Sequence, residues 1–197
     1  TGTLTQNEMT VVKTFTDNNI VDVTGKGYAP EGQFLRNEEP LDIEDTSGLK
    51  LLLSIGTLCN DATLDYVAED NIYRVLGDPT EGALVTLAEK GQLSNGDLNS
   101  KYPRVNEIPF DSERKMMTTF NENYIVGKIV SFTKGAPDII LKRCNSIFLK
   151  GKIQTLTEDL RKEIESTNSG FSQDALRVLA FSFRTHDSLP SEVTSEK

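Results

Sequence analysis

The sequence predicts an α+β fold in which helices flank a twisted antiparallel β-sheet. Short runs of β-branched and aromatic residues follow one another with only turns between them, whereas the helical patterns stand in separate blocks. The 197 residues correspond to about one domain. Hydrophobic residues make up 37% of the chain, which is enough for one sizeable core.

Elements of the first half follow from residue type and spacing. Strands are expected over residues 9–15, 20–23 and 72–76, and a buried helix over residues 47–59. The segments between them are turn residues at 16–19, a glycine-rich loop at 25–32 and an acidic connector at 38–45.

A second helix has clear boundary signals. Asp78 is its expected N-cap, Pro79 occupies the first turn, and Glu81 stands at the capping-box position. The helix is expected to end near Lys90, with Gly91 as the C-cap.

The second half returns to β patterns after a polar stretch at residues 94–100. Strands are expected over residues 105–110, 116–120, 124–132 and 178–183, with a hairpin turn at 121–123. Residues 147–153 predict another hairpin that turns at 150–152. Helices are expected over residues 137–144 and 157–176, the longer one broken near Gly170.

Charge and cysteine usage argue against several function classes. Lys and Arg number 21 against 30 Asp and Glu, and the net charge of -9 repels nucleic acid and anionic membranes. Cys59 and Cys144 form no CxxC, and His186 is the single histidine, so disulfide scaffolds and zinc sites are poor interpretations. The apolar stretch around residues 49–59 is shorter than the roughly 18–20 residues of a membrane span. A soluble chain without direct membrane contact is expected.

The common nucleotide-binding motifs are absent from the sequence. No Gly stands five positions ahead of the Gly-Lys pairs at Gly25, Gly127 and Gly151, so there is no P-loop. No GxGxxG follows a strand, and HExxH is also missing. A nucleotide site in this chain would have to be built in another way.

Two positions at predicted strand ends allow a ligand interpretation. Phe110 precedes a charged turn, where an exposed aromatic ring would stack on a purine for roughly 1–3 kcal/mol per base; the alternative is an ordinary core phenylalanine. Lys134 stands beside a helix start, and Gly135 would let the backbone approach a ligand closely. The alternative for Lys134 is a solvated lysine.

Other charged positions carry two interpretations as well. The capping box accounts for Glu81 without any ligand. Arg114 and Lys115 are either surface residues or electrostatic guides. Arg177 offers a planar, permanently charged fork that suits phosphate, or it forms a surface ion pair.

Taken together, several strings resemble one family. They are Thr1-Gly-Thr-Leu-Thr5, Gly77-Asp-Pro-Thr-Glu-Gly-Ala83, Ile108-Pro-Phe-Asp-Ser-Glu-Arg-Lys115 and Thr133-Lys-Gly-Ala-Pro137, with further matches at residues 25–32, 59–62 and 176–179. Their order and spacing resemble the nucleotide-binding domain of type II P-type ATPases, most closely calcium pumps. Thr1–Thr5 is similar to the tail of that family's D-K-T-G-T-L-T signature.

The resemblance implies a role for each matching residue. Phe110 would stack on the adenine of ATP, Met117 would pack against it, and Glu81 would accept a hydrogen bond from its amino group. Lys115 would line the pocket, Lys134 with Gly135 would form its base, and Arg177 would reach the phosphates. Ser112 departs from the pattern, because many animal calcium pumps place an arginine there. Weaker ATP binding, or compensation by Arg114, is the expected consequence.

The resemblance also implies an organisation and a function. Residues 1–8 would be a hinge remnant, 9–186 the nucleotide-binding domain and 187–197 a C-terminal hinge or linker. The domain would hold ATP while the γ-phosphate passes to an aspartate that precedes Thr1, so no catalytic residue and no metal site are expected in this chain. Mg²⁺ would bind with the phosphorylation domain. The expected partners are ATP and the phosphorylation and actuator domains of a plasma-membrane pump, and the chain alone is expected to be a cytoplasmic monomer that binds ATP without hydrolysing it.

Two other functions stay open at the level of sequence. An Asp-x-Thr-Gly-Thr start also marks haloacid-dehalogenase-type phosphatases, although a truncated one would lack its nucleophilic aspartate. A stand-alone protein-interaction module would bind through its acidic surface, and would tolerate the loss of Phe110 and Lys134.

Overall fold

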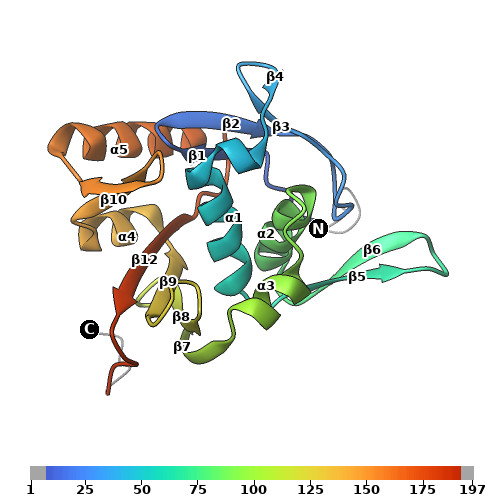
Figure 1. The fold of residues 1–197 in the computed structure, drawn as a ribbon. Helices are drawn as coiled ribbons and strands as arrows, with labels where there is room; N and C mark the ends of the chain where they lie inside the picture. Colours follow the sequence, from blue (N-terminus) through green and yellow to red (C-terminus); the bar gives the residue numbers. More distant parts are fainter. Residues whose placement is uncertain (1–7, 192–197) are drawn as a thin grey trace. The chain divides into compact units, whose positions relative to one another are not determined.

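The computed structural model describes residues 8–191, and its fold is α+β as predicted. The described chain divides into two compact units, one ending at Leu98 and the other beginning at Asn99. Figure 1 shows the ribbon of both. The domain boundaries predicted at residues 8/9 and 186/187 stay predictions, and the Thr1–Thr5 string lies outside the described residues.

The first unit begins with a small antiparallel sheet of order β1-β2-β3-β4. Its strands are β1 (Lys13–Thr16), β2 (Asn19–Val23), β3 (Phe34–Arg36) and β4 (Glu39–Pro40). Asp17 and Asn18 both have positive φ, as the tight turn between β1 and β2 requires.

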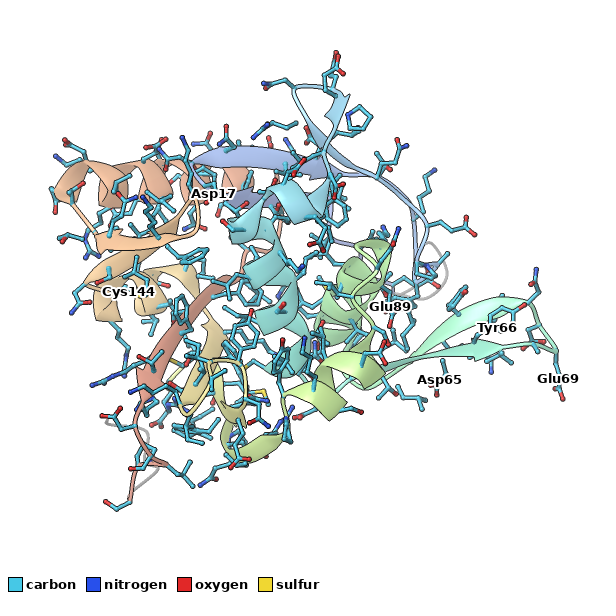
Figure 2. All side chains as sticks on the ribbon, viewed as in Figure 1. Asp17, Asp65, Tyr66, Glu69, Glu89 and Cys144 are labelled. Carbon is cyan, nitrogen blue, oxygen red and sulfur yellow. The ribbon has the colours of Figure 1, made fainter. Side chains whose placement is uncertain are left out.

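Helices cover this sheet and build the core of the first unit. They are the 3-10 turn η1 (Ile43–Asp45), α1 (Ser47–Leu58) and α2 (Pro79–Lys90), while α3 (Asn95–Lys101) spans the division between the units. Asp17 binds the first turn of α1, because its Oδ2 accepts a hydrogen bond from Gly48 N at 3.1 Å (Figure 2). The core unites both helices with the sheet: Val21, Val23, Phe34, Leu49, Leu53, Leu87 and Ala88.

A two-stranded hairpin completes the first unit. Strands β5 (Thr63–Val67) and β6 (Ile72–Leu76) pair antiparallel, and the hairpin extends away from α2 (Figure 1). At its base Val75 lies so close to Gly82 that a Cβ there would come within 2.4 Å of Val75 Cγ1. The small residue therefore permits the hairpin to pack on α2.

The second unit is organised around a four-stranded antiparallel sheet of order β12-β9-β8-β7. Its strands are β7 (Arg104–Asp111), β8 (Met116–Glu122), β9 (Ile129–Gly135) and β12 (Ala180–His186). Between β9 and β12 lie α4 (Pro137–Arg143), the hairpin of β10 (Ser146–Leu149) and β11 (Lys152–Thr155), and α5 (Glu158–Gln173). Helix α4 packs against β9 and β12, and α5 contacts α4.

Strand pairing explains several departures from the predicted elements. β1 starts at Lys13 instead of residue 9. Its partner strand β2 ends at Val23, whose backbone N–H donates to Val12 O, so β2 offers no partner to the residues before Val12. β9 starts at Ile129 instead of residue 124, since Ile129 pairs with Glu122 and residues 123–128 form the connection. The predicted hairpin turn at residues 121–123 is therefore wrong. β12 extends to His186 because β9 offers partners along its whole length.

Other corrections concern segments without a strong local signal. The connector at residues 38–45 contains β4 and η1, the polar stretch at 94–100 lies in helix α3 from Asn95 onward, and β3 and β5 are not among the predicted strands. Helix α5 continues through Gly170, where a break was expected. One glycine costs a helix only about 1 kcal/mol, and the neighbouring Phe171 is buried.

Candidate functional site

Four strand ends meet at one end of the second unit's sheet. Asp111, the last residue of β7, pairs with Met116, the first of β8, and Met116 pairs in turn with Gly135 at the end of β9. Gly135 also pairs with Ala180, the first residue of β12. This end of the sheet thus gathers five of the seven predicted site residues, which are Phe110, Lys115, Met117, Lys134 and Gly135, and Arg177 lies on the segment that leads to it.

Phe110 lies in a β-bulge near this end. The register of β7 against β8 shifts between Ile108 and Asp111, so that Pro109 and Phe110 together oppose Met117. The side chain of Phe110 is 65% exposed, so the core interpretation is wrong. A ring with this exposure has most of its apolar surface available for a planar partner.

Met117 and Lys134 lie side by side in the adjacent strands. They are a direct antiparallel pair, so their side chains share one face of the sheet. Both residues are buried. Phe110, Met117 and Lys134 therefore follow one another across β7, β8 and β9, over two strand spacings of roughly 10 Å, and of these three residues Phe110 is the exposed one.

The turn from β7 to β8 is held by the Asp111 carboxylate. Its Oδ1 accepts hydrogen bonds from the backbone N–H groups of Glu113 at 2.9 Å and Arg114 at 2.8 Å. Lys115 closes the turn with φ of 56° and is exposed. The segment therefore presents its positive side chains from a fixed backbone.

Gly135 allows this turn to touch the end of β9. A Cβ at Gly135 would come within 2.3 Å of Lys115 O and 2.5 Å of Met116 Cβ. The adjoining Ala136 N donates to Lys115 O at 3.0 Å. The close approach that the sequence assigned to a ligand is made here by the chain's own backbone.

Arg114 has no acceptor for part of its guanidinium group. Its Nε and Nη1 atoms are buried and have no hydrogen-bond partner in the described structure. Burial lowers the pKa of Arg114, the nearby charge of Arg143 at the end of α4 lowers it further, and Asp111 opposes both effects. Two like charges and unpaired buried donors thus coexist beside the turn.

Arg177 belongs to the segment that leads from α5 into β12. Leu176 N donates to Phe171 O at 3.0 Å, which ties this segment back to the end of α5. Arg177 is exposed and stands three positions before Ala180. The segment that carries it leads into β12 at the end of the sheet where Lys134 and Gly135 lie.

Glu81, the seventh predicted residue, belongs to the first unit. It lies in the first turn of α2, where Asp78 Oδ1 caps the helix by accepting from Thr80 N at 2.8 Å and Glu81 N at 3.3 Å. Asn60 connects this turn to α1, because its Nδ2 donates both to Gly56 O at 2.8 Å and to Glu81 O at 3.0 Å. The Glu81 carboxylate accepts from Asp61 N at 3.4 Å.

The described chain has neither a metal-binding cluster nor a membrane-spanning helix. Within residues 8–191, no group of three or more His, Cys, Asp and Glu side chains could hold a metal ion. No helix in that part of the chain is long and apolar enough to cross a bilayer.

Comparison with known proteins decides the family. Residues 48–197 match the family model described as P-type ATPase, cytoplasmic domain N. The chain belongs to this family. The resemblance predicted from the short strings is therefore confirmed across most of the chain.

Relatives of this P-type ATPase chain agree with the match. The calcium-transporting ATPase of Bacillus subtilis is 38% identical over 93% of the chain, and calcium-transporting ATPase 1 of Lactococcus lactis is 39% identical over 98%. A calcium-transporting ATPase type 2C member 1 from Bos taurus is 35% identical over 91%. The matched regions cover 20%, 19% and 18% of these proteins, so the chain spans about one fifth of their length.

Asn60 and the unpaired donors of Arg114 were the features that sequence reasoning missed. Asn60 had a signal, since an asparagine directly after a helix is a common bridge to the next segment. The unpaired nitrogens of Arg114 result from the packing of the turn against residues distant in sequence, so no local sequence pattern predicts them.

Proposed function

We propose that this P-type ATPase domain binds ATP, with the adenine at the exposed ring of Phe110 and the phosphates directed toward the cations at the same sheet end. The exposure of Phe110 carries the proposal. A large ring left mainly in water gains free energy when a base stacks on it.

The neighbouring residues fit an adenine nucleotide. Met117 and Lys134 continue the row from Phe110 across the sheet; both are buried, so in this proposal they would form the base of the site beside the exposed ring. Lys115 and Arg177 add exposed positive charge for phosphate oxygens. By the family resemblance alone, Glu81 would accept a hydrogen bond from the adenine amino group.

The parent pump would pass the γ-phosphate to an aspartate of its phosphorylation domain. Mg²⁺ would accompany the phosphates at that domain. Phosphoryl transfer depends on positioning together with metal and charge stabilisation. This chain would supply the positioning, within a pump that moves a cation, with calcium favoured by the names of the relatives. The actuator domain would be a further partner.

The proposal is tested by titrating ATP and AMP into the isotope-labelled chain and following backbone amide shifts. Saturable shifts at Phe110, Lys134 and Arg177, largely reproduced by AMP, are expected. Phe110→Ala should weaken both ligands by about 1–3 kcal/mol, the value of one stacked base. Because the ring is exposed, the variant should unfold at nearly the same temperature as the parent chain.

A matched variant separates stacking from general surface effects. Val126 is 94% exposed on the connection between β8 and β9, and Val126→Ala should leave ATP affinity unchanged. Equal affinities in the Phe110→Ala and parent chains would refute the adenine site. An interaction module would then become the favoured function.

A further inference from the structure

The position of the Phe110 ring depends on one extra residue in β7. The register of β7 against β8 shifts between Ile108 and Asp111, because the bulge holds one more residue than the facing stretch of β8. In a regular ladder that continued from Ile108, Phe110 would stand opposite Met116. Successive side chains alternate between the two faces of a sheet, so this slip of one residue would turn the ring to the other face.

Burial does not decide this register. Residues 109–111, at the end of β7, are exposed, and β7 is the outer strand in the order β12-β9-β8-β7. The register of a strand is weakly specified where no buried face holds it. Strand β8, in contrast, pairs with β9 from Met116 to Glu122 without a shift. Something other than burial must therefore hold the end of β7 in register against a sheet that is itself well defined.

Asp111 holds the turn that follows the bulge. Its Oδ1 accepts hydrogen bonds from Glu113 N at 2.9 Å and Arg114 N at 2.8 Å, and its main-chain oxygen accepts from Lys115 N at 2.7 Å. An aspartate side chain that binds the backbone two residues on stabilises a turn by itself. In a hairpin the turn sets the register of the two strands that it joins. The three hydrogen bonds therefore favour the register in which Asp111 pairs with Met116.

We propose that Asp111 is a positioning residue of the nucleotide site, which locks the bulge of β7 and so keeps the Phe110 ring in line with Met117 and open to a base. The inference rests on the proposed ATP function and adds the residue that orients its stacking ring. Asp111 acts through Phe110 and needs no contact with the nucleotide. Its negative charge opposes phosphate groups, so the site requires the acceptor oxygen of Asp111 and not the charge.

The test compares Asp111→Ala with Asp111→Asn in the 197-residue chain. Alanine removes the acceptor of both backbone N–H groups, whereas asparagine keeps an acceptor oxygen and loses the charge. Adenosine, which carries no phosphate, is titrated into the parent chain and both variants, and Kd is taken from backbone amide shifts. Asp111→Ala should bind adenosine roughly three- to tenfold more weakly, because part of the stacking is lost. Asp111→Asn should stay within about twofold of the parent chain.

The register of β7 is measured without any ligand, by nuclear Overhauser effects between β7 and β8. The parent chain and Asp111→Asn should show effects that join residue 111 to Met116. In Asp111→Ala these should weaken, and effects between Phe110 and Met116 should appear. An aspartate that only stabilised the fold would lower the free energy of unfolding without changing this pattern.

A second aspartate provides the matched control. Asp42 belongs to the first unit, and its Oδ1 accepts a hydrogen bond of the same kind from Glu44 N at 2.9 Å. Asp42→Ala removes this bond and one negative charge, and it should change neither the adenosine affinity nor the effects between β7 and β8. If Asp111→Ala loses its dispersed amide spectrum, Asp111→Ser replaces it. A serine hydroxyl makes the same turn bonds more weakly, so its adenosine affinity should lie between those of Asp111→Asn and a chain without the lock.

The outcomes distinguish this inference from the ATP proposal itself. Equal adenosine affinities of Asp111→Ala and the parent chain, or unchanged effects between β7 and β8, overturn the positioning role. Adenosine binding by Asp111→Asn as weak as that of Asp111→Ala also overturns it, because the charge would then be the property that matters. A parent chain that binds no adenosine refutes the adenine site, and a register that shifts in Asp111→Ala but not in Asp111→Asn would still support the lock on Phe110.

Discussion

At the scale of single residues, Gly135 shows how the site end of the sheet is fixed. A Cβ at residue 135 would lie only 2.3 Å from the carbonyl oxygen of Lys115. Since this neighbour is backbone, it has no flexible side-chain end to move. Gly135→Ala is therefore expected to displace the 112–115 turn and to reduce the free energy of unfolding by about 1–3 kcal/mol, measured by urea titration.

A second glycine provides the control for Gly135→Ala. Gly170 lies within α5, and a Cβ there would meet no atom within 4 Å. Gly170→Ala should stabilise the chain by about 0.5–1 kcal/mol through lower backbone entropy in the unfolded state. If Gly135→Ala and Gly170→Ala changed the free energy of unfolding in the same direction, the close approach of Lys115 O would not be the reason why residue 135 is a glycine.

Residue-scale prediction from sequence had a clear limit at Phe110. The sequence placed it at a strand end, yet allowed both a core ring and an exposed one. The decision came from the bulge opposite Met117 and the resulting exposure of 65%. Both depend on the pairing of two strands, which the residue types around position 110 do not encode locally.

At the scale of elements, Lys90 links the end of α2 to the glycine-rich loop. Its Nζ donates to Thr24 O at 2.8 Å, and the residue is 9% exposed. Gly25 and Gly32 make room for it, because a Cβ at either would meet the Lys90 side chain or the loop backbone. The glycines of the motif at residues 25–32 thus have a structural explanation, because they leave space for the buried side chain of Lys90.

Burial lowers the pKa of Lys90 below the ordinary value of 10.5. The unfolded chain therefore binds more protons than the folded one between the lowered pKa and 10.5, so this lysine makes stability rise with pH in that window. Lys90→Met should remove the rise, which is measured as the difference in unfolding free energy between the two chains from pH 7 to 10.5. Lys26→Met, at an exposed lysine of the same loop, controls for net charge; a constant difference would contradict the expectation.

Elements whose ends are marked by capping or turn residues were predicted well, and those whose ends depend on pairing with distant strands were not. Asp78, Pro79 and Lys90 mark the ends of α2 as expected, and the turn between β10 and β11 has positive φ at Lys150 and Gly151. Gly91 follows α2 as predicted, but its φ is -84°, and the left-handed residue is Gln92 with φ of 59°. The start of β9 was missed because only its pairing with β8 defines it.

At the scale of the whole molecule, net charge sets the affinity that ATP can reach. The chain carries -9, so long-range repulsion opposes a polyanion even though Lys115 and Lys134 lie at one sheet end and Arg177 on the segment that leads to it. We expect Kd between roughly 0.1 and several mM, equivalent to about 4–5.5 kcal/mol. Calorimetry or amide shifts would measure it, and sub-micromolar affinity of the isolated chain would contradict this reasoning.

Strand order in the second unit also has a consequence for how the chain acquires its structure. Strands β7, β8 and β9 are successive neighbours in sequence, whereas β12 pairs with β9 only after α4, β10, β11 and α5 have intervened. Local hairpins close quickly and long-range pairings slowly. Until β12 arrives, β9 remains an unpaired edge that other chains can add to. Lys134, at the base of the proposed pocket, thus stands on the strand whose protection comes last, and aggregation during refolding should begin there.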